Sequence, residues 1–450
     1  MARSRRQTRT GGREATKGHI PGLYSLAVGM PKTAAPPGWK WTLLTDVARL
    51  ESGHTPSRKR PEYWDGEIPW IGIRDATANY GRVLQDTSQH TNELGIKNSS
   101  ARVLPKNTVC LSRTASVGYV VVMGRPMATS QDFVNWVCSD RLDYQFLKYV
   151  LVSERESFLR FASGTTHQTI YFPEVKAFHV CLPPVCVQRR IASILAAYDD
   201  LIENNLRRIK ILEEMAQNLY REWFVNFRFP GHENVKMVDS ELGKVPEGWR
   251  RVPFTDIAEV LSGGTPKTKV AEYWDGTIPF FAPKDAPNAF YVTSTEKSIT
   301  DLGLQKCNSK LYPKNTVFIT ARGTVGKVIL PAFDMAMNQS CYALRGKDGI
   351  SQFFLFLTTL WQVDYLKKNT GGATFDTIVV DTFRRMKVLN PDASLIADFS
   401  SQVEPMFALI LNLLSNNITL RKTRDLLLPK LISGELDVSD LDIEVPEEAA

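Results

Sequence analysis

Two long stretches of the chain, residues 188–227 and 399–431, carry apolar residues at alternating intervals of three and four. This heptad pattern predicts a long helix that packs along a second helix. Each predicted helix has the other as its obvious partner, so we expect an antiparallel, coiled-coil-like pair. Two unrelated amphipathic helices, each packed on its own globular block, are the alternative. Polar residues interrupt the two patterns at Asn205, Asn417 and Arg424.

Asn205 and Asn417 are the candidates for setting the register of this helix pair. A buried asparagine weakens a helix pair but fixes its register, because its amide has no partner in a slipped alignment. Each follows another asparagine, Asn204 or Asn416. The adjacent residue could therefore take the buried position while Asn205 and Asn417 face solvent, and the sequence leaves both arrangements open.

Most of the remaining chain forms two blocks, residues 39–186 and 246–394, that are rich in glycine, proline, aromatic and β-branched residues. Short apolar stretches broken by turns, such as Ile68–Ile73 and Val117–Met123, predict strands with a few helices among them. We therefore expect each block to be a mixed α/β domain, within a protein of the α+β class.

The second block repeats the first. The residues Glu-Tyr-Trp-Asp-Gly at 62–66 recur 210 residues later, and the pattern Ser-Gly-x-Thr-Pro at 52–56 recurs at the same offset. Pro-Lys-Asn-Thr-Val at 105–109 recurs 208 residues later. Matches in the same order at a nearly constant offset indicate a tandem duplication. Two duplicated domains separated by two paired helices predict a pseudo-twofold arrangement.

Charge follows the same division of the chain. The first 38 residues hold seven basic and one acidic residue, and residues 395–450 hold four and ten. The two blocks hold 17 basic and 14 acidic, and 18 basic and 14 acidic. Such a distribution suits blocks that meet a polyanion and connectors that meet protein. We divide the chain into a basic N-terminal arm (1–38), domain 1 (39–186), a central helix and linker (187–245), domain 2 (246–394), a C-terminal helix (395–436) and an acidic tail (437–450).

The sequence lacks the catalytic and metal-binding motifs expected of an enzyme. An adenine methyltransferase needs an Asn/Asp-Pro-Pro-aromatic loop, and Pro183-Pro184 follows Leu182. A translocating ATPase needs a glycine-rich phosphate loop ending in Gly-Lys-Ser/Thr, and Gly326-Lys327 lacks both the upstream glycine and the hydroxyl residue. The cysteines form no zinc-type doublets. We therefore expect no catalytic residues, no metal site and no cofactor on this chain.

No apolar run approaches the roughly 18 residues of a membrane span. The basic start has no apolar core of a secretory signal behind it. We expect no membrane partner and a cytoplasmic protein.

The order of the repeated motifs resembles the type I restriction specificity subunits. It comprises Gly-Trp, Ser-Gly-x-Thr-Pro, Tyr-Trp-x-Gly-x-Ile-Pro, Pro-Lys-Asn-Thr-Val and Val-Gly, then Gln-Arg-Arg-Ile-Ala and a long helix, over roughly residues 19–436. Residues 427–436 look like the closing signature of that family. The resemblance implies a non-catalytic, sequence-specific DNA-binding subunit of a restriction-modification complex. A stand-alone DNA-binding or scaffolding protein without methyltransferase partners is the alternative.

The resemblance also implies partners. Each block would be a target-recognition domain that reads one half of a bipartite site in double-stranded DNA. The helices would be spacers that also dock two methyltransferase (modification) subunits, with up to two restriction/translocase subunits in addition. S-adenosylmethionine, ATP and Mg would then be bound by the partner subunits.

Readout of base sequence needs side chains that can form bidentate hydrogen bonds, such as Arg, Asn and Gln. Lys, Ser and Thr contact the DNA backbone and position the protein on it. Residues identical in both copies are interpreted as framework, with Trp64 and Trp274 in the core. Polar residues that differ between copies in matching loops are the candidate DNA contacts, and the shared Gln131 and Gln339 join them with a structural role equally open. The candidates in domain 1 are His54, Ser57, Arg58, Lys59, Arg74, Arg113, Ser130, Gln131, Thr166, His167 and Gln168. Those in domain 2 are Lys267, Lys269, Lys284, Arg322, Asn338, Gln339, Thr374 and Asp376.

The turn before Val-Gly differs between the copies. It reads Ser-Arg-Thr-Ala-Ser at 112–116 and Thr-Ala-Arg-Gly-Thr at 320–324. The sequence therefore leaves open whether Arg113 and Arg322 occupy equivalent places.

Overall fold

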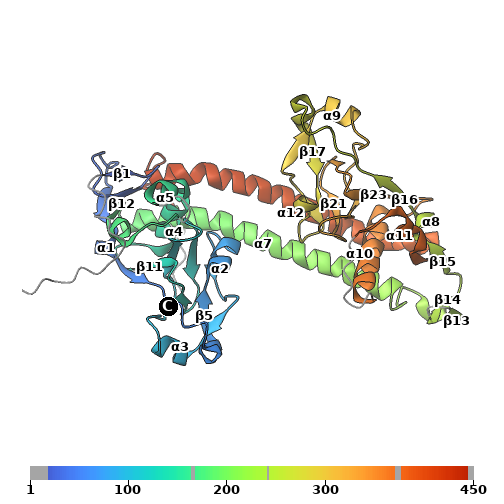
Figure 1. Ribbon diagram of the computed structural model, residues 1–450, viewed down its shortest axis with the longest axis horizontal. Helices are drawn as coiled ribbons and strands as arrows, with labels where there is room; N and C mark the ends of the chain where they lie inside the picture. Colours follow the sequence, from blue (N-terminus) through green and yellow to red (C-terminus); the bar gives the residue numbers. More distant parts are fainter. Residues whose placement is uncertain (1–18, 164–167, 241–242, 370–376, 444–450) are drawn as a thin grey trace, which may run out of the picture. The chain divides into compact units, whose positions relative to one another are not determined.

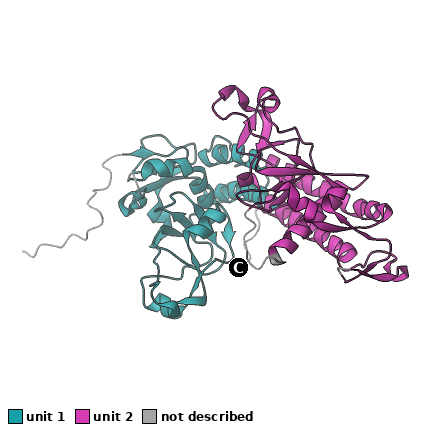
Figure 2. Cartoon of the chain, turned by 45° about the vertical axis from the view of Figure 1, so that its right-hand side comes forward, with its two compact units in different colours: residues 1–201, 420–450 teal, residues 202–419 magenta. Residues whose placement is uncertain are grey.

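The computed structural model describes residues 19–163, 168–240, 243–369 and 377–443. The chain forms two compact units (Figure 2), one made of residues 1–201 and 420–450 and the other of residues 202–419. Two long helices, α7 (Val185–Phe224) and α12 (Ala393–Ser433), contribute residues to both units.

The first unit has a five-stranded sheet in the order β4-β11-β8-β9-β6, a three-stranded sheet in the order β10-β5-β7 and a four-stranded sheet in the order β1-β2-β12-β3. Only the pairs β5–β10 and β6–β9 among these strands are parallel. The strands are β1 (Ile20–Pro21), β2 (Leu26–Val28), β3 (Lys40–Leu43), β4 (Ala48–Ser52), β5 (Trp64–Ile71), β6 (Val83–Leu84), β7 (His90–Thr91), β8 (Val109–Ser112), β9 (Val120–Met123), β10 (Ala128–Thr129), β11 (Phe133–Cys138) and β12 (Phe178–Leu182). The shorter helices are α1 (Leu44–Val47), η1 (Pro61–Tyr63), α2 (Ile73–Ala78), α3 (Glu93–Lys97), α4 (Tyr144–Ser153), α5 (Arg155–Phe161) and α6 (Phe172–Lys176).

The second unit has a five-stranded sheet in the order β16-β23-β20-β21-β18 and a three-stranded sheet in the order β19-β17-β22, with two-stranded sheets β15-β24 and β13-β14. Its strands are β13 (Met237–Ser240), β14 (Gly243–Pro246), β15 (Arg250–Pro253), β16 (Ala258–Ser262), β17 (Trp274–Phe281), β18 (Tyr291–Val292), β19 (Lys297–Ile299), β20 (Val317–Thr320), β21 (Val328–Pro331), β22 (Ala336–Met337), β23 (Cys341–Gly346) and β24 (Lys387–Asn390). Its shorter helices are η2 (His232–Asn234), α8 (Phe254–Ile257), η3 (Ala271–Tyr273), η4 (Pro283–Asp285), α9 (Asp301–Gln305), α10 (Gln352–Asn369) and α11 (Val380–Arg385).

The five-stranded and three-stranded sheets of the two units correspond strand by strand. The two parallel pairs recur as well, as β17–β22 and β18–β21. Helix α4 contacts strands of the five-stranded sheet in the first unit, and α10 contacts the corresponding strands in the second (Figure 1). The duplication of a mixed α/β domain predicted from the sequence is confirmed.

The two long helices pack against each other inside each unit, drawn green and red in Figure 1. In the first unit Asp199 of α7 contacts Arg424 of α12. In the second unit the rings of Trp223 and Phe399 lie 5.7 Å apart. Residue numbers fall along α12 as they rise along α7, so the pair is antiparallel, as predicted.

The helix ends differ from the predicted ones by a few residues. Helix α7 ends at Phe224 rather than 227, and Phe227 itself has a left-handed backbone with φ of 59°, which no helix could include. Helix α12 begins at Ala393 and continues past Pro429 to Ser433. By length and composition alone α12 could cross a membrane. Its heptad residues Val403, Ile410 and Leu413 are buried, and Phe407 packs against Phe353 of α10. Packing on α7 and on the globular domain of the second unit accounts for its apolar character.

Candidate nucleic-acid interface

In the first unit the loop after β4 crosses the turn between β10 and β11. A Cβ atom on Gly53 would lie 1.9 Å from the carbonyl oxygen of Ser130, so only glycine permits the crossing. The backbone N–H of His54 donates to the carbonyl of Thr129 at 2.9 Å. The Thr55 hydroxyl donates to Oε1 of Gln131. The Ser-Gly-x-Thr-Pro motif is therefore one side of a joint, and Gln131 lies on the other.

The same joint occurs in the second unit. A Cβ atom on Gly263 would lie 2.0 Å from the carbonyl oxygen of Asn338. The N–H of Gly264 donates to the carbonyl of Met337 at 3.1 Å. The Thr265 hydroxyl donates to Oε1 of Gln339. Each unit thus brings two candidate loops together in the same way.

A tryptophan supports the loop that follows the joint. Nε1 of Trp64 donates to the carbonyl of Ser57 at 3.3 Å, and the guanidinium of Arg58 lies 3.9 Å from the Trp64 ring. Arg58 also donates to Gln89 at 2.9 Å. In the second unit Nε1 of Trp274 donates to the carbonyl of Lys267 at 3.3 Å.

The interpretation of Trp64 and Trp274 as core residues was only partly right, since Trp274 packs against a cluster of buried residues that includes Phe280 while neither ring is itself fully buried. Both side chains are only half-buried. Trp64 packs edge-on against Trp70, with centroids 5.2 Å apart, and presents a ring face to Arg58. A cation over an aromatic face is stabilised by the ring quadrupole. The repeated tryptophans are therefore supports for a surface loop.

Arg113 joins a third loop to this surface. Its guanidinium donates to the carbonyl oxygen of Gln131 at 3.1 Å and lies 4.7 Å from the Phe172 ring. Burial lowers the pKa of Arg113, and the nearby Asp132 opposes that shift. The guanidinium is thus held in place beside the joint with no carboxylate hydrogen-bonded to it among the described residues.

Arg113 and Arg322 do not occupy equivalent places. The N–H of Arg113 donates to the carbonyl of Asp132, and its carbonyl accepts from the N–H of Ile170. In the second unit Ala321 makes the corresponding two bonds, with Ser340 and Ile378. Arg322 is therefore one position further along and is exposed.

Two aspartates, the buried Asp75 and the partly buried Asp285, were not among the residues predicted from the sequence. The carboxylate of Asp75 accepts from the N–H of Gly72 at 2.9 Å and of Ser88 at 2.8 Å. Asp285 accepts from the N–H of Ala282 at 2.9 Å and of Glu296 at 3.1 Å.

Each of these aspartates ties the end of a long strand to the next loop and directly follows a basic candidate. That candidate is the exposed Arg74 in one unit and Lys284, paired with Glu296, in the other. The signal was the repeated basic-Asp dipeptide at an offset of 210.

The remaining candidates differ in exposure. Ser57, Lys59, Gln168, Lys267 and Lys269 are exposed, whereas His54 is partly buried. Ser130 is buried, with its hydroxyl 3.1 Å from Asp132, and Asn338 accepts from the N–H of Ser340 at 3.0 Å. Thr166, His167, Thr374 and Asp376 lie outside the described residues, as does the basic arm up to residue 18.

Polar residues also meet between the long helices. In the first unit Asp199 accepts from Arg424 at 2.6 Å, from the Tyr149 hydroxyl at 2.7 Å and from Lys148 at 3.4 Å. Burial lowers the pKa of Lys148, and Asp199 opposes that shift. In the second unit Asn205 and Asn417 are both buried.

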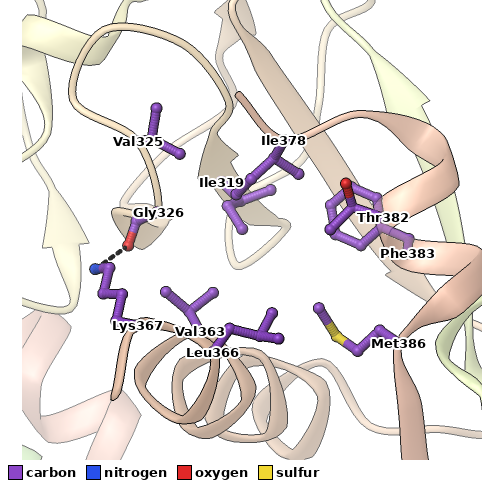
Figure 3. Close-up of a pocket in the computed structure, with 10 residues that line it drawn as sticks. All are labelled: Ile319, Val325, Gly326, Val363, Leu366, Lys367, Ile378, Thr382, Phe383 and Met386. Carbon is purple, nitrogen blue, oxygen red and sulfur yellow. Dashed lines mark hydrogen bonds between the residues drawn. The ribbon is translucent and has the colours of Figure 1, made fainter. Parts of the chain in front are cut away.

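Within the described residues no group of three or more His, Cys, Asp or Glu side chains could hold a metal ion. A partly open pocket in the second unit has a volume of about 20 Å³ (Figure 3), and its lining includes Ile319, Val363 and Phe383. The ammonium group of Lys367 donates to the carbonyl of Gly326 at 3.1 Å at its edge. Such a volume holds about one water molecule.

A family model described as the type I restriction modification DNA specificity domain matches residues 36–214 and 246–417. The chain is 28% identical over 414 residues to the type I restriction enzyme MjaIX specificity subunit of Methanocaldococcus jannaschii, covering 90% of this chain and 95% of that protein. It is 24% identical over 386 residues to the HindI specificity subunit of Haemophilus influenzae, covering 70% and 84%.

Among solved structures, the type I restriction-modification S subunit from M. genitalium has a similar fold. Its TM-score is 0.56 at 17% identity, over 89% of this chain and 98% of that one.

Proposed function

The chain belongs to the family of type I restriction-modification DNA specificity subunits, and from this premise we propose that each of its two domains reads one half of a bipartite site in double-stranded DNA. It is the non-catalytic specificity subunit of such a system, with two target-recognition domains. We assign these domains to residues 39–186 and 246–394.

One observation carries the proposal. The joint between two surface loops is built from the same Gly, Thr and Gln residues in both units. The side chains around it differ between the units. Gly264 takes the position of His54, Lys267 that of Ser57 and Ala321 that of Arg113. A constant frame with different polar side chains suits two domains that recognise different base sequences.

The proposed contacts are the candidates named from the sequence. In domain 1 the contacts of the joint include Arg113, Gln131 and His54. Ser57 follows in the same loop as His54, and Arg74 follows the strand β5 that pairs with β10. In domain 2, Lys267, Gln339 and Arg322 take part in the corresponding loops. We propose four further exposed residues as DNA contacts: Lys59, Gln168, Lys269 and Lys284.

The partners follow from the family. We propose that the paired helices dock two methyltransferase subunits and that restriction subunits join the complex, which acts in the cytoplasm. The duplicated domains supply two similar surroundings for two copies of one partner. S-adenosylmethionine, ATP and Mg would be bound by those partners.

Sequencing of methylated adenines in cells with and without this gene tests the proposal. We expect one split motif to lose methylation when the gene is deleted. If every methylated motif persists, the chain does not direct a methyltransferase. Purification of the tagged chain then tests the alternative of a stand-alone DNA-binding protein, which would elute without a methyltransferase.

A further inference from the structure

The exposed Thr–Gln pair is the same in both domains. Thr55 donates to Gln131 in domain 1, and Thr265 donates to Gln339 in domain 2. Both glutamines are exposed, and both threonines are partly buried. The polar residues around these pairs differ between the domains, so the pair is a constant element on a variable surface.

The pair is not needed to close the joint between the loops. Backbone bonds from His54 to Thr129 and from Gly264 to Met337 already close it. The close approach at Gly53 and Gly263 fixes the same crossing. A hydrogen bond between exposed side chains adds little to stability because water competes for both groups.

The direction of the hydrogen bond determines what each glutamine offers. The threonine hydroxyl occupies one side of Oε1 and orients the amide, so the NH₂ group is the outward polar group. No described residue accepts a hydrogen bond from Nε2 of Gln131 or Gln339. The group therefore presents donors, which suit an acceptor oxygen or ring nitrogen of DNA.

We infer that each pair binds a phosphate oxygen of the DNA backbone, one in each half-site, which rests on the proposed function. Two domains that read different bases have no reason to share a contact with a base. Both half-sites, however, have phosphates at the same spacing. Thr and Gln commonly make such positioning contacts, which set the register of a protein on the duplex without reading sequence. The pair fixes where each domain lies, and the variable side chains around it read the bases.

Gln131→Lys tests this contact, because a lysine at a phosphate releases one counterion. We expect the full-length chain, with the subunits that co-purify with it, to bind DNA more tightly at low salt. The slope of log affinity against log salt should steepen by about 0.9. The gain should be equal on cognate and unrelated duplexes. Gln339→Lys should do the same, and Gln131→Glu should weaken binding to both duplexes.

Gln85→Lys is the matched control, since Gln85 is exposed in the same domain, lies outside the joint and the candidate contacts, and would receive the same charge. A Gln131→Lys slope equal to that of this control would overturn the contact. Selection from a library with a randomised half-site distinguishes a phosphate acceptor from an acceptor on a base edge. A change of preference at one base position in Gln131→Lys would overturn the phosphate assignment in favour of a base edge.

The sequence preference of the wild-type chain distinguishes a failure of this inference from a failure of the proposed function. A wild-type chain with no preference for any sequence would refute the proposed function. A selective wild-type chain with an indifferent Gln131 would refute only this inference.

Discussion

Asn205 donates a hydrogen bond of 2.9 Å from its side-chain amide to the side-chain oxygen of Asn417, between α7 and α12 in the second unit. The two residues are only 4% and 1% exposed. The Asn417 amide donates in turn to the carbonyl of Ile202 at 3.4 Å. Their neighbours Asn204 and Asn416 are the exposed ones. Of the two arrangements that the sequence left open, the structure has the one that a register-setting pair requires.

Replacing one asparagine should be worse than replacing both. Asn417→Leu leaves the Asn205 amide buried without its partner, which should cost about 1–3 kcal/mol of unfolding free energy. Asn205→Leu combined with Asn417→Leu should keep or raise the melting temperature, while the preferred gap between half-sites broadens. Methylation of a library of sites with varied gaps measures the second effect. Asn204→Ala with Asn416→Ala is the control, and an equal loss of gap preference there would refute the register role.

The length of the helix pair should set the gap of the DNA site. We predict that one heptad inserted after Leu212 and one after Ile410 shifts the preferred gap. Seven residues rise roughly 10 Å, about three base pairs at 3.4 Å per step. The same library of gaps is the measurement. An unchanged gap preference, in a variant that still methylates DNA, would show that these helices do not set the distance.

The charged cluster at Asp199 should be replaceable only as a whole. Asp199→Leu leaves Lys148, which is 5% exposed, without its carboxylate, while Arg424 keeps its contact with Asp425. The substitution should cost about 3 kcal/mol. The second unit places Phe356 and Phe407 at the positions of Lys148 and Asp199, 208 residues later. These rings pack 5.9 Å apart.

Borrowing that apolar set should restore stability. We predict that Lys148→Phe, Tyr149→Leu, Asp199→Phe and Arg424→Leu together melt within a few degrees of the wild type, because a buried ion network can be exchanged for apolar side chains. The exchange includes Tyr149, since its hydroxyl would otherwise lose Asp199 as its acceptor. Thermal unfolding of the single and quadruple variants provides the comparison. A quadruple variant no more stable than Asp199→Leu would contradict this prediction.

The two domains should be independent readers. Exchanging residues 246–394 for the same block of another family member should change one half-site and leave the other intact. Single residues give a finer version: Arg113→Ala should relax one position in the half-site of domain 1, by about 1–3 kcal/mol of discrimination. Arg322→Ala should act only on the other half-site. Altered preference in both halves from either substitution would refute independence.

The repeat and the two helices could be read directly from the sequence. A heptad pattern follows from the 3.6-residue turn of the helix. Helices over residues 188–227 and 399–431 can therefore be predicted without tertiary information. Copies such as Glu62–Gly66 and its repeat at 272–276 are matched by identity alone. The family resemblance rested on the same motifs, and it was confirmed.

Contacts between distant residues could not be predicted in this way. Asp75 was missed because its importance lies in the two backbone N–H groups of Gly72 and Ser88, which only the fold places beside it. Trp64 was assigned to the core because it is identical in both copies of the repeat. Its support of Arg58 depends on where the following loop returns.

The sequence by itself determined the duplication, the paired helices and the residues from which a DNA surface could be built. Only the tertiary structure decided that Asn205 meets Asn417 rather than solvent, that Ala321 and not Arg322 stands at the place of Arg113, and that Thr55 reaches Gln131. Periodicity and repetition are properties of neighbours along the chain, whereas a hydrogen bond depends on distances of about 3 Å between atoms far apart in sequence. Those distances exist only after the strands and helices have packed.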